Sequence, residues 1–240
     1  MRVRVVIFMT IFSGSATTAS AQDYVILLHG LCRSSRSMEP MRKALLKAVY
    51  SVTNLDYPSR SATVEELSEA VVGKALADCR QSGATRIHFV THSLGGILVR
   101  SYFARHSACD LGRVVMLGPP NQGSELVDRL GSWSLFSLIN GPTGLELGTS
   151  ASSLPNRLGA PKYCVGVIAG NRSINWINSL LILGPDDGKV SVERTKFSGI
   201  TDHIVVPTAH PFMMRNREVI RQTIEFLRNG KFDYAGRRKC

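Results

Sequence analysis

Short apolar stretches alternate with helical patterns along most of this 240-residue sequence. The stretches are rich in residues that favour strands, and the longer segments between them have helical spacing. The expected strands cover 24–30, 52–58, 86–93, 113–120, 162–170 and 203–207, and the expected helices cover 37–51, 63–83, 93–106 and 215–230. Strands separated by helices of about ten or more residues favour a parallel sheet covered on both faces. The sequence therefore predicts an α/β fold with a mostly parallel sheet, whose strand-end loops share one edge where ligands bind.

The third expected strand ends in an unusual turn. In "HFVTHSLGG", residues 88–96, Ser93 directly follows a strand-like run and precedes two glycines and an apolar helical run. A nucleophile elbow, which raises a serine hydroxyl above a sheet, needs such small neighbours because strand and helix backbones approach closely. Gly95 meets this need, whereas Thr91 stands where the strict G-x-S-x-G pattern has glycine. In isolation, a match of this kind is better explained by a serine that caps a helix.

A second feature accompanies the turn. The first expected strand ends in His29-Gly30-Leu31, the position from which an acyl-transfer enzyme of this architecture supplies a backbone N–H to an oxyanion hole. The N–H groups of Leu31 and Leu94 would converge there on the developing negative oxygen, and each such donor contributes roughly 2.7 to 4 kcal/mol. His29 is expected to orient this loop, although a strand-end histidine bonded to backbone needs no catalytic role.

Together these motifs resemble the α/β-hydrolase superfamily, specifically its compact bacterial lipase-like and acetyltransferase/hydrolase branch. The resemblance covers nearly all of residues 22–240, which we expect to form a single α/β-hydrolase domain. It rests, in chain order, on "LLHGL", "VTHSLGGI", "GPPNQGSEL", "GPDDGKVSVE" and "VPTAHPFMMRN". Several motifs in the right order are far more specific than any one of them.

The resemblance implies a catalytic triad that runs Ser, then Asp or Glu, then His along the chain. Ser93 is then the nucleophile, and Asp187 in "DDGKV" matches the position of the acid before a glycine. Asp186 beside it is the nearest competitor, and Asp56 after the second expected strand is a weaker one. An Asp-Gly pair also forms turns, whether or not the aspartate has a chemical role.

The base is chosen from six histidines. Four of them belong to expected strands, the elbow or a helix end, namely His29, His88, His92 and His106. Of the other two, His210 follows the last expected strand, lies between Pro207 and Pro211, and matches the family's position in "HPFMMRN". His203 stands at the start of that strand and is the alternative. The predicted triad is therefore Ser93, Asp187 and His210.

These residues imply hydrolysis of a carboxylic ester through an acyl-enzyme, with no metal and no organic cofactor. An acyltransferase that passes the acyl group to an alcohol or amine would use the same residues. A catalytically idle scaffold that binds envelope components is the alternative from another class, and the complete set of motifs argues against it.

Two segments fall outside the alternation of strands and helices, and both carry large apolar side chains. Residues 121–161 contain Trp133, Leu135 and Phe136, and residues 171–188 contain Ile174, Trp176, Ile177 and "LLILG". These side chains either fill the core beneath long loops, which we favour for the second segment, or form an apolar rim over the site. A rim would suit a short- to medium-chain acyl group.

Five cysteines, Cys32, Cys79, Cys109, Cys164 and Cys240, lie after residue 21. At least one must stay unpaired within a monomer, and none of them is spaced as metal ligands are. Cys79 and Cys109 each close an expected helix beside the elbow strand, so they are our first choice for a disulfide.

The sequence is strongly basic, with a formal charge of +11 at pH 7. Such a charge favours anionic surfaces or ligands, and an anionic envelope surface is one candidate partner beside the ester substrate. Nucleic acid is not expected, because the charges are scattered along a chain expected to be exported.

The first 21 residues predict a signal peptide and export to the periplasm or the medium. They contain Arg2 and Arg4, an apolar run over 5–12 and the small-x-small pattern Ala19-Ser20-Ala21. The run is far shorter than the roughly 20 residues that a membrane span needs. We expect cleavage between Ala21 and Gln22, so mass spectrometry of the exported protein should show Gln22 as its first residue. An exported form that keeps Met1 would contradict the prediction.

Overall fold

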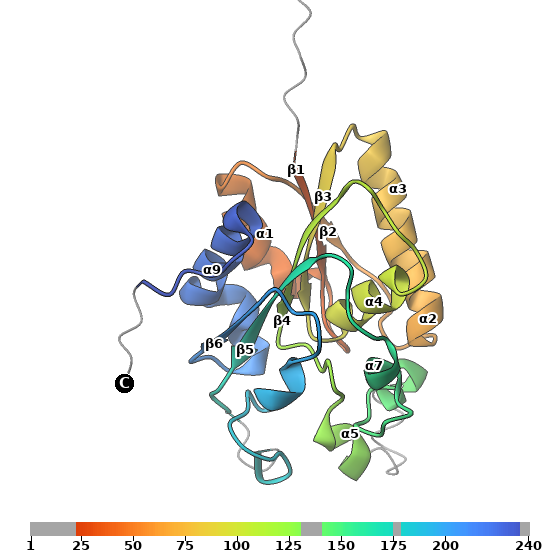
Figure 1. Cartoon of the computed structure of the whole chain (residues 1–240), viewed down its shortest axis with the longest axis vertical. Helices are drawn as coiled ribbons and strands as arrows, with labels where there is room; N and C mark the ends of the chain where they lie inside the picture. Colours follow the sequence, from red (N-terminus) through yellow and green to blue (C-terminus); the bar gives the residue numbers. More distant parts are fainter. Residues whose placement is uncertain (1–22, 131–140, 175–178, 236–240) are drawn as a thin grey trace, which may run out of the picture.

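A parallel sheet organises the part of the chain that the computed structural model describes, residues 23–130, 141–174 and 179–235 (Figure 1). Its strands are β1 (Asp23–Leu28), β2 (Ser51–Leu55), β3 (Arg86–His92), β4 (Leu111–Leu117), β5 (Cys164–Gly170) and β6 (Asp202–Val206). They lie in the order β2-β1-β3-β4-β5-β6, and every pairing of neighbours is parallel. The predicted strands and the predicted α/β fold are confirmed. The predicted signal peptide lies outside the described residues.

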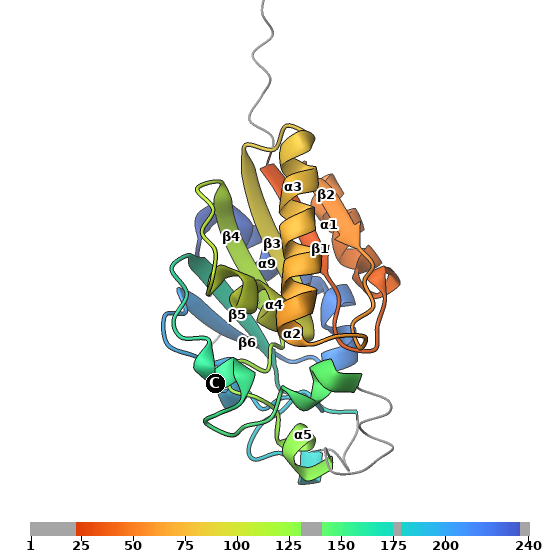
Figure 2. The ribbon, with the colours of Figure 1, turned by 90° about the vertical axis from the view of Figure 1, so that its right-hand side faces the viewer.

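Helices cover both faces of the sheet, as predicted. Figure 1 shows α1 (Glu39–Lys47) and α9 (Arg217–Asn229) on one side of the sheet, and α2 (Val64–Leu67), α3 (Lys74–Gln81) and α4 (Leu94–Phe103) on the other. Figure 2 looks onto this second side, where α3 lies across the strands. The predicted helix over 63–83 contains a π-helical segment, Ser68–Gly73, between α2 and α3, and it begins with the expected capping box of Thr63 and Glu66.

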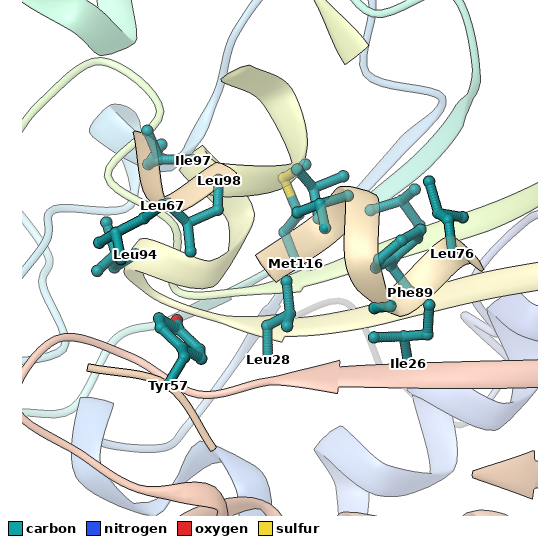
Figure 3. Close-up of a cluster of buried hydrophobic side chains, with 14 of the residues drawn as sticks. Ile26, Leu28, Tyr57, Leu67, Leu76, Phe89, Leu94, Ile97, Leu98 and Met116 are labelled. Atoms are coloured by element: carbon teal, nitrogen blue, oxygen red, sulfur yellow. The ribbon is translucent and has the colours of Figure 1, made fainter. Parts of the chain in front are cut away.

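The pleat of the strands divides the apolar residues between two cores. In β1, Ile26 and Leu28 face α2, α3 and α4, whereas Val25 and Leu27 face α1 and α9. Figure 3 shows the first core, in which Phe89 and Met116 from neighbouring strands pack beneath the helices. Strands buried on both faces read as continuous apolar runs, which is why β1, β4 and β5 are largely apolar in sequence.

The remaining elements are short and lie mostly in the long connections. They are α5 (Glu125–Leu130), α7 (Leu154–Arg157) and the 3₁₀ helices Ser35–Met38, Glu193–Thr195 and His210–Arg215. The last of these differs from the sequence prediction, which treated the segment after the final strand as a loop. Pro211 at its second position suits the first turn of a helix, because proline lacks the N–H that would be unpaired there. Within the described residues, no helix is both long enough and apolar enough to cross a membrane.

The proposed disulfide between Cys79 and Cys109 is wrong, since both cysteines are free. Cys79 is buried, and its sulfur lies 3.9 Å from the hydroxyl oxygen of Thr53 on β2. Cys109 is exposed in the turn before β4. Strands β2 and β4 are separated by β1 and β3, and neighbouring strands are about 4.8 Å apart. Cys79 thus lies against β2, whereas Cys109 lies in the turn that precedes β4.

Helix α1 ends in a turn that normally requires glycine. Tyr50 donates its backbone N–H to the carbonyl of Leu45, and Val49 donates to Leu46, both at 3.1 Å. This is the Schellman pattern, in which the residue after the cap adopts the left-handed conformation. That residue is Val49, with φ of 69° and a side chain that is 90% exposed. A β-branched residue is strained in this conformation. Because the Val49 side chain is exposed, its packing offsets little of that strain.

Replacing Val49 with glycine should therefore raise the free energy of unfolding by about 1 kcal/mol. Chemical denaturation of the wild type and V49G measures the difference. Gly230, which ends α9 with φ of 73°, provides the matched control. G230A should lower the free energy of unfolding by a similar amount, because it introduces the strain that V49G removes. A less stable V49G would contradict the argument.

Candidate active site

Ser93 occupies a strained turn between β3, which ends at His92, and α4, which begins at Leu94. Its φ of 52° and ψ of −119° are unusual for a residue with a side chain. Such strain costs about 1 to 3 kcal/mol and persists only where the surroundings impose it. Here the Ser93 N–H donates to the carbonyl of Leu117 on β4 at 2.9 Å, and the Ser93 carbonyl accepts from the N–H of Gly96 at 3.0 Å.

Close packing of α4 on β1 explains the glycine after the serine. A Cβ at Gly95 would lie 2.8 Å from the carbonyl oxygen of Leu28, so no larger residue fits without a shift of the backbone. Thr91, the departure from the strict motif, is fully buried. Its hydroxyl oxygen would lie 3.3 Å from a Cβ at Gly96. The second glycine therefore leaves the room that the threonine side chain uses.

Asp187 and His210 form a buried hydrogen-bonded pair. His210 Nδ1 lies 2.7 Å from Asp187 Oδ2, and the backbone N–H of His210 donates to the Asp187 carbonyl at 2.9 Å. Asp187 Oδ1 accepts from the N–H groups of Lys189 and Val190 at 3.0 and 2.9 Å. These donors stabilise the charge of a carboxylate that is fully buried. Because the carboxylate accepts at Nδ1, the proton of a neutral His210 is on Nδ1, and Nε2 is left as the basic nitrogen.

The alternative acid and base make other contacts. Asp186 Oδ1 accepts from the Ser179 hydroxyl at 2.9 Å and from the Gly188 N–H at 2.7 Å, so this side chain shapes the loop that carries Asp187. His203 lies on β6, where its Nε2 is 2.9 Å from the hydroxyl oxygen of Thr195. Asp56 accepts from the N–H of Ser35 and is largely exposed. None of these three is hydrogen-bonded to Ser93 or His210 within the described residues.

Gly118 connects the serine turn to the histidine-aspartate pair. It follows Leu117, to which Ser93 is hydrogen-bonded, and its φ is 54°. A Cβ there would lie 2.9 Å from Asp187 Oδ2 and 3.0 Å from His210 Nδ1. The structure therefore brings Ser93, Asp187 and His210 to the carboxyl edge of the sheet, the lower end in Figure 1. Within the described residues, the Ser93 hydroxyl makes no hydrogen bond to His210, a bond that often tightens only when substrate binds.

The loop after β1 lies against Ser93. A Cβ at Gly30 would be 3.1 Å from the Ser93 Cβ. His29 Nδ1 donates to the Gly30 carbonyl at 2.9 Å, and its Nε2 accepts from the Tyr57 N–H at 3.3 Å. His29 is thus a neutral tautomer that holds the loop, as the sequence predicted, and burial lowers its pKa.

The two predicted oxyanion donors flank the serine. Leu94 is the first residue of α4, and a helix leaves its first N–H groups without an intrahelical partner. Leu31 directly follows Gly30, and in the described part of the chain its N–H has no backbone acceptor. Among the described residues, neither N–H group therefore has a backbone acceptor.

His92 contacts His210, the histidine of the hydrogen-bonded pair, a role that the sequence analysis did not assign. Its Nε2 lies 3.1 Å from the His210 carbonyl oxygen, and the two rings are 4.6 Å apart. Burial holds the pKa of His92 well below its usual value, and the charge of His210 acts in the same direction. His92 is therefore neutral, donates from Nε2 and positions the backbone of His210. Its place beside Ser93 was the only signal in the sequence.

Arg100 on α4 is a second residue that the sequence analysis missed. Its guanidinium is buried and donates to the carbonyls of Asn121 and Pro155, at 2.9 and 3.1 Å. It also lies 4.1 Å from the centre of the Phe197 ring. Burial lowers the pKa of Arg100 to about 10, so it stays charged at neutral pH. Arg100 ties the nucleophile helix to the connection between β4 and β5.

The predicted apolar segments are described only in part. Ile174, Leu180 and Leu183 are 65%, 74% and 77% exposed, whereas Ile182 is buried. The favoured interpretation of the second segment, that its side chains fill the core, is therefore wrong for the first three and holds for Ile182. Trp133, Leu135, Phe136, Trp176 and Ile177 lie outside the described residues. In the described ranges, no group of three or more His, Cys, Asp or Glu side chains could hold a metal ion.

The position of Gly118 gives a test of this geometry. G118A adds a Cβ against Asp187 and His210, so the Nδ1 hydrogen bond should lengthen or break. Proton NMR of the wild type should show a strongly downfield Nδ1–H signal from His210, and the signal should be lost in G118A. G83A is the control, because Gly83 has φ of 84° but nothing lies within 4 Å of its Cβ position. The argument fails if both variants keep the signal.

Comparisons with known proteins agree with the fold described above. A family model described as the alpha/beta hydrolase family matches residues 25–162. The mature lipase BlEst2 of Bacillus licheniformis is similar in structure, with a TM-score of 0.71 and 20% sequence identity over 87% of this chain and 93% of that one. Phospholipase PlaB of Legionella pneumophila has a TM-score of 0.63 and 18% identity over 87% of this chain and 59% of that one.

A metagenomic carboxyl esterase has a TM-score of 0.62 and 17% identity, over 80% of this chain and 65% of that one. No curated protein matches the sequence. At these identities the solved structures show the fold that they share with this chain.

Proposed function

The chain belongs to the alpha/beta hydrolase family, and on that premise we propose that it hydrolyses carboxylic esters through an acyl-enzyme on Ser93. The observation that carries the proposal is the buried hydrogen bond between His210 and Asp187, at the sheet edge where Ser93 is held in a strained turn. A helix-capping serine would need neither the strain nor the pair.

The reaction follows from the protonation states of these groups. His210 Nε2 removes the proton of the Ser93 hydroxyl as its oxygen attacks the ester carbonyl carbon. Asp187 stabilises the imidazolium that forms. The tetrahedral intermediate then collapses, the bond to the leaving alcohol breaks, and His210 returns the proton to the alcohol oxygen. Water, activated by the same histidine, hydrolyses the acyl-enzyme and releases the carboxylic acid.

Negative charge on the carbonyl oxygen is stabilised by backbone donors. The N–H groups of Leu31 and Leu94 point to the space above Ser93 in this proposal, and the N-terminus of α4 adds the positive end of its dipole. The hydrogen bond from His29 to Gly30 keeps the loop of Leu31 against Ser93. This set of residues completes the reaction without a metal or an organic cofactor.

We further propose an ester with an apolar acyl group of short to medium length, acted on outside the cytoplasm. The exposed side chains of Ile174, Leu180 and Leu183 support an apolar acyl group, because their segment leads directly into the loop of Asp187. Arg2, Arg4 and the Ala19-Ser20-Ala21 pattern support export.

Substitution of the triad tests the mechanism. S93A removes the nucleophile and H210A removes the base, so each should lower kcat for a p-nitrophenyl ester by at least about 10⁴-fold with the fold intact. The double variant should be little worse than either single one, because triad members act as a unit. D187N should cause a smaller but still large loss. Steady-state kinetics and circular dichroism measure activity and folding.

The rival residues supply the controls. H203A and D186N should lose far less activity than H210A and D187N, because neither side chain contacts the His210 ring. An inactive, folded H203A beside an active H210A would show that the base is misassigned. Full esterase activity in S93A would refute the mechanism as a whole.

A further inference from the structure

A groove lies beside the loop that carries Leu31. It has a volume of about 650 Å³, within the range of about 300 to 1,000 Å³ that small-molecule sites occupy. Two loops distant in the sequence form its walls, one at Cys32 and Arg33 and the other at 57–61. We call it the arginine groove, because Arg33 and Arg60 both line it.

The arginine groove is joined directly to the active-site loop. Cys32, next to Leu31, donates its backbone N–H to the Ser59 hydroxyl oxygen at 3.1 Å, which links the two walls. Tyr57 stacks on the His29 ring, with ring centres 4.0 Å apart, and donates its hydroxyl to the His29 carbonyl. The groove lining therefore begins one residue after Leu31, in the loop whose Gly30 lies against Ser93.

The charges of the groove have one sign. Arg33 and Arg60 are its charged lining residues, and the described lining contains no aspartate or glutamate. In the described part of the chain, Arg33 forms no salt bridge. Its charge also acts at the active site, where it adds to the effect of burial in lowering the pKa of His92. The Ser59 hydroxyl accepts from Cys32, so its own proton is available to a ligand.

We propose that the arginine groove binds an anionic group of the substrate, a carboxylate or a phosphate, while the ester lies at Ser93. The proposal rests on the proposed function and narrows its substrate class to esters that carry a negative charge. Arginine suits this role because its planar guanidinium donates two parallel hydrogen bonds to either group. Both arginines are exposed, and they place part of the strong basic charge of the chain in the lining of this groove.

The test compares matched esters. The p-nitrophenyl ester of hexanoic acid is neutral, and the mono-p-nitrophenyl ester of adipic acid has the same chain length with a carboxylate at its far end. For the wild type, kcat/KM should be higher for the adipate ester. The ratio of adipate to hexanoate kcat/KM should fall about tenfold in R33Q/R60Q, and by less in each single variant. It should also fall with rising salt, because exposed charges are screened.

R36Q is the matched control. Arg36 lies three residues after Arg33, is exposed, and does not line the groove. Its removal changes the net charge of the protein as R33Q does, so the ratio should stay at the wild-type value. An equal fall in R36Q and R33Q would overturn the proposal, because it would show a general effect of net charge.

A second pair of esters places the charge on the alcohol side. Dihexanoylglycerol and dihexanoylglycerol 3-phosphate, both below their aggregation limits, differ only in the phosphate. The proposal is supported if, in either pair of esters, the wild type prefers the charged ester and R33Q/R60Q loses that preference. The pair that shows the preference tells whether the groove binds the acyl side or the alcohol side of the ester. The absence of such a preference in both pairs overturns it.

Failure of the proposed function gives a different result. If the wild type hydrolyses the neutral esters and S93A does not, ester hydrolysis through Ser93 stands, whatever the ratios of kcat/KM between charged and neutral esters. If the wild type hydrolyses none of the esters, the function fails, and calorimetric titration with adipate then tests the groove alone. Adipate binding that is lost in R33Q/R60Q and kept in R36Q supports an anion site, and no binding overturns it.

Discussion

The close approach of α4 to β1 at Gly95 is the constraint on which the active site depends. A side chain there would meet the carbonyl of Leu28, so the helix can start only if this position is glycine. Ser93 adopts its positive φ two residues before this contact, and the hydrogen bond to Leu117 holds it there. The approach also brings the loop of Gly30 against the Ser93 side chain. One contact between two backbones thus sets the nucleophile, the oxyanion loop and the start of the helix at the same time.

Features that depend on local sequence could be predicted. Strands β1, β4 and β5 appear as largely apolar runs because both of their faces are buried, and the capping box of Thr63 and Glu66 lies within four residues. Asp187 and His210 could be proposed because they match the motifs of the family that the sequence resembles, in loops that follow strands, and parallel strands end at one edge. The sequence left Asp186 and His203 as alternatives. The structure separates them through hydrogen bonds to Ser179 and Thr195, which no spacing in the sequence reveals.

Features that depend on segments far apart could not be predicted. Arg100 looks like an ordinary helix residue, yet its guanidinium is buried against carbonyls that come 21 and 55 residues later. The arginine groove is also formed by segments far apart in the sequence. Its walls follow β1 and β2 and come together because these two strands pair. The predicted disulfide between Cys79 and Cys109 was wrong because it also concerned two distant segments. Their positions at helix ends gave no information on which strand each would face.

The neutrality of His92 has a consequence for the charge on His210. The two rings are 4.6 Å apart, so a proton on His92 would raise the free energy of the imidazolium that the mechanism needs. Burial prevents this by lowering the pKa of His92. Asp187 is the buried partner of His210, and its second oxygen accepts from two backbone N–H groups. The proposed mechanism thus needs a proton on only one of the two neighbouring rings, that of His210, which is hydrogen-bonded to the aspartate.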